Sequence, residues 1–111
     1  MTDTKLLALA RAVYPQHDVH TYTGVTDQVY WKWRAKPEDG HYTVWNFDPA
    51  NNSDQFVAVL AWLLRNIATI VTHRNVEVWH SNDILVCDIE HDGTPSGLRA
   101  AVTEAGMRVV G

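Results

Sequence analysis

The chain has 111 residues, a hydrophobic share of 46%, a formal net charge of −4 and one cysteine. This length predicts a single domain covering residues 1–111, and a lone Cys87 excludes the disulfide-stapled class of secreted proteins. The nine Lys and Arg residues are scattered, which argues against a nucleic-acid-binding protein. The longest apolar stretch, residues 56–64, is too short to span a bilayer, and the N-terminus lacks the order of a signal peptide. We therefore expect a soluble cytoplasmic protein.

The first half of the chain predicts a helix followed by a β-hairpin. Apolar residues recur at helical spacing over residues 3–14, and Pro15 ends that helix. Residues 16–26 fit either a loop or a short edge strand. Two-residue alternation then indicates a hairpin over residues 27–47, with a proline- and glycine-containing turn in its middle.

The second half predicts a long helix, a second hairpin and a final helix. The long helix runs from about residue 54 to residue 71, and its broad apolar surface favours homo-oligomerisation. Alternating apolar residues indicate a hairpin over residues 75–91. The final helix begins after the capping residue Thr94, and Gly106 is expected to end it.

The resulting element order, α-ββ-α-ββ-α, predicts an α+β fold with a four-stranded, mainly antiparallel sheet. Both faces of the predicted strands carry large apolar residues. An α-β-α sandwich, with helices on both faces of the sheet, is therefore favoured. The main alternative is a sheet that has helices on only one of its faces.

The tryptophans on the predicted strands are the most suggestive candidates for a binding surface. Aromatic side chains on an open sheet face can stack on bases or sugars, or can anchor a protein partner. The same side chains can equally fill the core between sheet and helices. The candidates for an aromatic binding face are Trp31, Trp33, Trp45 and Trp79.

A second candidate site combines His80 with the acidic end of the last predicted strand. Asp88 and Glu90 share one strand face and are followed by His91, so these residues could act as an acid–base pair or hold a divalent cation. A solvated strand end is the simpler interpretation of the same residues. Nothing in the sequence supplies a nucleophile or completes a metal site, so we expect no catalytic residues, metal or cofactor.

The stretch 45–62 resembles part of small phage-encoded proteins of the phage ABA sandwich type. The matching pieces are an aromatic segment with Pro49, the polar helix start around Ser53, the apolar helix 56–64, the strand 76–79 and the segment 94–101. The resemblance implies an α-β-α sandwich and a phage or prophage origin. It implies no established activity and carries over no catalytic residues.

Two functions from different classes follow from these patterns. The first is a small non-catalytic phage accessory protein that binds a host or phage protein and so could inhibit a host defence system. The alternative is a metal-dependent or acid–base enzyme using the cluster of His80, Asp88, Glu90 and His91.

Overall fold

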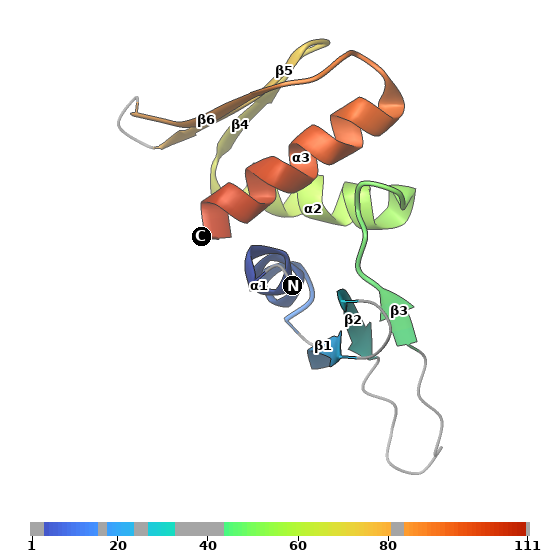
Figure 1. The fold of residues 1–111 in the computed structure, drawn as a ribbon. Coiled ribbons are helices and arrows are strands. Elements are labelled where there is room, and N and C mark those ends of the chain that lie inside the picture. The colour runs from blue at the N-terminus through green and yellow to red at the C-terminus, as the bar shows by residue number, and fades with distance from the viewer. Residues whose placement is uncertain (1–3, 16–17, 24–26, 33–43, 81–83, 111) are drawn as a thin grey trace. The chain divides into compact units, whose positions relative to one another are not determined.

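The computed structural model describes residues 4–15, 18–23, 27–32, 44–80 and 84–110 (Figure 1). The chain divides into two compact units, Met1–Phe47 and Asp48–Gly111, which we call the first unit and the second unit. Each unit has its own three-stranded sheet. The single domain expected from the chain length stays a prediction.

The first unit is a short helix with a three-stranded antiparallel sheet of order β1-β2-β3. Its elements are α1 (Thr4–Val13), β1 (Asp18–Thr23), β2 (Asp27–Lys32) and β3 (Val44–Asn46). Helix α1 packs against β1 and β2, and Leu9 and Ala10 on this helix are buried. The rings of Tyr14 and Phe47 meet edge to face, with their centroids 6.1 Å apart.

The second unit pairs a three-stranded antiparallel sheet of order β4-β5-β6 with two helices. Its elements are α2 (Ser53–Asn66), β4 (Ala68–Val71), β5 (Asn75–His80), β6 (Ile84–Glu90) and α3 (Pro95–Val110). Helix α3 packs against β5 and β6, and α2 packs against α3. Both helices lie on the same side of the sheet (Figure 1).

The core of the second unit lies between the sheet and α3. Val76 and Val78 on β5 are fully buried, and their register partners Ile89 and Cys87 on β6 are almost so. Val102 on α3 is also fully buried. Burying one such branched side chain contributes about 1.5–3 kcal/mol, so these contacts fix which face of the sheet points inward.

Both helices of the second unit begin at well-formed caps. Asn52 caps α2, and its side chain accepts a hydrogen bond of 3.0 Å from the Gln55 amide. The buried Gln55 side chain in turn accepts a hydrogen bond of 2.6 Å from the Asp48 amide. At α3 the Thr94 hydroxyl accepts a hydrogen bond of 3.0 Å from the Gly97 amide, and Pro95 occupies the first helical position.

The α+β class is confirmed, but the four-stranded sheet and the α-β-α sandwich are not. Each predicted hairpin recruits a third strand from its own unit, β1 or β4, so two separate sheets form. Residues 18–23 take the strand alternative that the sequence left open. Within the second unit, the helices cover one face of the sheet.

Two predicted helix ends are wrong. Helix α2 ends at Asn66, because the chain turns extended at Ile67 and pairs with β5 as strand β4. This segment is rich in β-branched residues, which favour strands. Helix α3 continues through Gly106 to Val110, because Gly106 is buried inside the packed helix and does not serve as its terminal residue.

Candidate functional site

The side of the β4-β5-β6 sheet that points away from α3 is the candidate site, and we call it the outer face. Strand side chains alternate between the two sides of a sheet, and directly paired residues point the same way. Because Val76 and Val78 point inward, their neighbours on β5 point outward. The outer face comprises Ala68, Ile70, Asn75, Glu77, Trp79, Leu85, Asp88 and Glu90.

One half of the outer face is apolar. Trp79 lies in the middle strand, between Ala68 on β4 and Leu85 on β6, its register partners. Ile70 lies in the adjoining row of the same face. Ile70 is 50% exposed and Leu85 is 45% exposed. Ile70 and Leu85 lie on the two strands that flank β5, in neighbouring rows of the face. Both exposed fractions are high for large aliphatic side chains.

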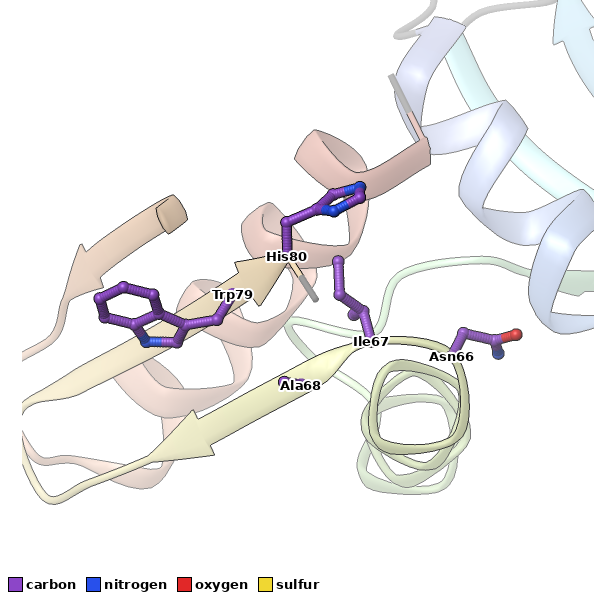
Figure 2. A pocket seen from close by; sticks show the side chains of 5 residues that line it. All are labelled: Asn66, Ile67, Ala68, Trp79 and His80. Carbon is purple, nitrogen blue, oxygen red and sulfur yellow. The ribbon is translucent and has the colours of Figure 1, made fainter. Parts of the chain in front are cut away.

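Trp79 marks the edge of a shallow pocket at this end of the sheet. The pocket has a volume of about 270 Å³ and is lined by Asn66, Ile67, Ala68, Trp79 and His80. In Figure 2 the Trp79 and His80 side chains leave β5 in different directions, and Trp79 lies beside Ala68. The Trp79 indole Nε1 is buried and has no hydrogen-bond acceptor within the described part of the chain. A buried N–H without an acceptor is a destabilising feature.

The other half of the outer face is acidic. Glu77 on β5 is paired directly with Asp88 on β6, and Glu90 follows on the same side of β6. Asp88 and Glu90 are exposed, and Glu77 is half-buried. The Asn75 side chain donates a hydrogen bond of 2.7 Å to Asp88 Oδ1. The outer face thus runs from an apolar end at Ala68, Trp79 and Leu85 to an acidic end at Asp88 and Glu90. Ile70 lies in the row between them, directly across from Glu77.

The four candidate tryptophans do not lie on one sheet. Trp31 on β2 is paired with Trp45 on β3 in the sheet of the first unit. Trp79 belongs to β5 of the second unit. Trp33 lies outside the described residues. Of the predicted aromatic face, Trp31 and Trp45 are thus register partners in one sheet, whereas Trp79 belongs to the other sheet.

The histidine and carboxylate cluster is not assembled either. His80 is paired with Ile84 at one end of the hairpin, whereas Glu90 is paired with Asn75 at the other. At about 3.3 Å per residue, the length of β5 separates the two ends by about 16 Å. His91 uses both ring nitrogens locally: Nε2 lies 3.0 Å from the Thr72 carbonyl and Nδ1 accepts from the Gly93 amide.

Cys87 behaves as a core residue. Its side chain is 5% exposed on the inner side of β6. Burial raises the pKa of the Cys87 thiol, which keeps the thiol protonated near neutral pH. This agrees with the interpretation of Cys87 as a small buried hydrophobe.

No group of three or more potential metal ligands occurs among the residues that the structure describes. In the same residues, no helix is long and apolar enough to cross a membrane. Comparisons with family models, curated proteins and solved structures found no match to this chain. The resemblance to phage ABA sandwich proteins therefore stays a prediction from the residues quoted above.

Two features of the outer face were missed from the sequence. Ile70 was assigned to the long helix, so its position beside Glu77 on a sheet could not be foreseen. The pairing of Glu77 with Asp88 could have been found, because it follows from the predicted hairpin once its register is set. The outward position of Leu85 could not have been found from the sequence, because a bulge at Val86 changes which residues of β6 point outward.

Proposed function

We propose that this chain is a non-catalytic protein that binds another protein through its outer face. The observation that carries the proposal is a pair of exposed aliphatic side chains on the two strands that flank Trp79. Leu85 is the register partner of Trp79 and Ile70 that of Glu77, on a face that the unit's own helices leave uncovered. Burying what remains exposed of Ile70 and Leu85 would contribute about 1 kcal/mol for each side chain. Trp at the centre of such a patch is typical of residues that dominate binding energy.

The resemblance to phage ABA sandwich proteins suggests where the partner is found. In this proposal the chain acts in the cytoplasm of an infected bacterium and binds a phage or host protein. A component of a host defence system is one such partner.

The proposal is tested by capture from bacterial lysate with matched surface variants. The first variant combines Ile70→Ser with Leu85→Ser on the outer face. The control combines Val57→Ser with Leu64→Ser on α2, where the side chains are 59% and 57% exposed. We expect one or more proteins to be retained by the wild type and the control but lost from the outer-face variant. Binding of the purified partner is then measured by calorimetry.

Equal retention by the wild type and the outer-face variant would overturn the proposal, as would an equal loss from both variants. Circular dichroism melting of both variants checks that the substitutions leave the fold intact. Both variants shorten side chains that are about half exposed, so both should unfold cooperatively at similar temperatures, somewhat below that of the wild type.

A further inference from the structure

We infer that the segment bound by the outer face is a cationic amphipathic helix of the partner protein. This inference rests on the proposed function and names the chemistry of the partner. It follows from three observations: a directly opposed pair of like charges on the outer face, the charge balance of the second unit, and the spacing between the acidic and apolar ends of the outer face.

The like charges are Glu77 and Asp88, which lie directly opposite each other. The His91 amide donates to the Arg74 carbonyl at 2.8 Å, which marks the neighbouring pair, Asn75 with Glu90, as a non-hydrogen-bonded pair of the ladder. Pairs alternate along a ladder, so Glu77 and Asp88 form the next such pair. In this type the Cα atoms are only about 4.5 Å apart and the side chains are closest. Like charges in that position are destabilising.

No cation of the described residues relieves this pair. The second unit contains eight acidic residues, four arginines and no lysine, so it carries the whole formal net charge of −4. The Arg99 guanidinium bonds to the Ala50 carbonyl and the Arg108 guanidinium to Glu104. Arg74 lines a small depression with Glu90 at the turn. Within the described part of the unit, the neutral Asn75 side chain donates to Asp88, but neither Glu77 nor Asp88 has a cationic partner.

The spacing of the two ends fits one face of a helix. Glu77 and Trp79 are two residues apart on β5, a separation of about 7 Å. Residues four apart on a helix are separated by about 6 Å along its axis. A Lys or Arg that meets Glu77 and Asp88 is thus followed, one turn later, by an apolar residue against Trp79 and Leu85. The inner face of this sheet already packs against a helix, α3.

The test measures binding of fluorescently labelled peptides to the full chain by anisotropy. One peptide of about 14 residues forms a cationic amphipathic helix of about 21 Å, close to the length of β5. A matched peptide replaces each Lys and Arg with Gln and keeps every apolar residue. We expect the cationic peptide to bind at least about tenfold more tightly than the neutral one, and its affinity to fall as salt is raised.

Variants that remove carboxylates show which part of the surface attracts the cationic peptide. Glu77→Gln with Asp88→Asn should lower the affinity for the cationic peptide about tenfold, without lowering the melting temperature, since the like-charge pair is removed. The control, Asp54→Asn with Glu104→Gln, makes the same change in net charge on the helices and should leave the affinity nearly unchanged.

Equal binding of the two peptides would overturn the inference while leaving the outer face as a protein-binding site. An equal loss of affinity in the two charge variants would overturn it too, because the peptide would then be attracted by the net charge of the chain and not by Glu77 and Asp88. If neither peptide binds, the inference fails, and the lysate capture with the Ile70 and Leu85 variant decides the proposed function separately.

Discussion

The Thr94 hydroxyl donates a hydrogen bond of 2.6 Å to Asp92 Oδ1, and the Thr94 amide donates another of 2.9 Å to the same oxygen. The hydroxyl also accepts from the Gly97 amide at 3.0 Å, so it links the carboxylate to the first turn of α3. The start of α3 is therefore held by a chain of hydrogen bonds, and the two bonds to Asp92 are stronger when its carboxyl group is ionised.

The first prediction concerns the pH dependence of this cap. The side-chain bond from Thr94, followed by its backbone bond, holds the pKa of Asp92 below its ordinary value of 3.8. Since the folded pKa is lower than the unfolded one, the stability from Asp92 is fully present above pH 3.8 and is lost as pH falls through the folded pKa. An NMR titration of the Asp92 carboxyl carbon should show Thr94→Val raising its midpoint. Thr94→Ser, which keeps the hydroxyl, should change it less, and an unchanged midpoint in Thr94→Val would contradict the assignment.

The second prediction is that Gly97→Ala destabilises the protein although alanine is the better helix former. A Cβ at Gly97 would overlap Asp92 Oδ1, so the carboxylate would have to leave its bonds with Thr94. In an Asp92→Ala background this obstacle is gone, and Gly97→Ala should be neutral or stabilising by up to about 1 kcal/mol. Urea unfolding of the double-mutant cycle measures the difference. Equal effects in the two backgrounds would show that the Asp92 contact is irrelevant.

The third prediction concerns the buried Gln55 side chain at the start of α2. Gln55→Met has a similar length but cannot accept from the Asp48 amide, so that N–H loses its partner. We expect a loss of about 1–3 kcal/mol in the free energy of unfolding. Asn51→Ala, which removes an exposed hydrogen bond to the Asp48 side chain, should cost less than about 0.5 kcal/mol. Equal losses for the two variants, measured by denaturant unfolding, would argue against a special role for Gln55.

The fourth prediction is that the chain forms a homo-oligomer through the exposed side of α2. Val57 and Leu64 lie seven residues apart on one stripe of this helix and are 59% and 57% exposed, with an exposed Ala61 between them. Multi-angle light scattering should show self-association of the wild type that is lost in Val57→Ser with Leu64→Ser. A wild type that remains monomeric at high concentration would refute this prediction.

Local patterns predicted most of the elements of the second unit. The alternation of Val76 and Val78 with Glu77 and Trp79 identified β5, and the structure buries the side that carries Val76 and Val78. Thr94 was recognised as the cap of the last helix, because its hydroxyl suits the first free amides of a helix. These features depend on neighbouring residues in the sequence, which is why they could be derived.

The features that the sequence did not predict depend on contacts between residues that are distant in the chain. Ile67 and Ile70 continue the apolar stripe of α2 at helical spacing, and only pairing with β5 makes their segment a strand. Which strands share a sheet is also decided by such pairing, so Trp79 was wrongly grouped with Trp31 and Trp45. For the same reason, the sequence pointed to aromatic rings as the site, whereas the exposed aliphatic pair of Ile70 and Leu85 came only from the fold.

The bulge in β6 determines which changes of chain length the second unit can absorb. Val86 stands between Leu85, paired with Trp79, and Cys87, paired with Val78, and has no partner of its own in the ladder. Deleting Val86 would leave every existing pair in place, whereas deleting Asp88 would exchange the buried and exposed sides of the neighbouring strand residues. A deletion at position 86 should therefore be tolerated better than one at position 88, because it preserves both faces of β6.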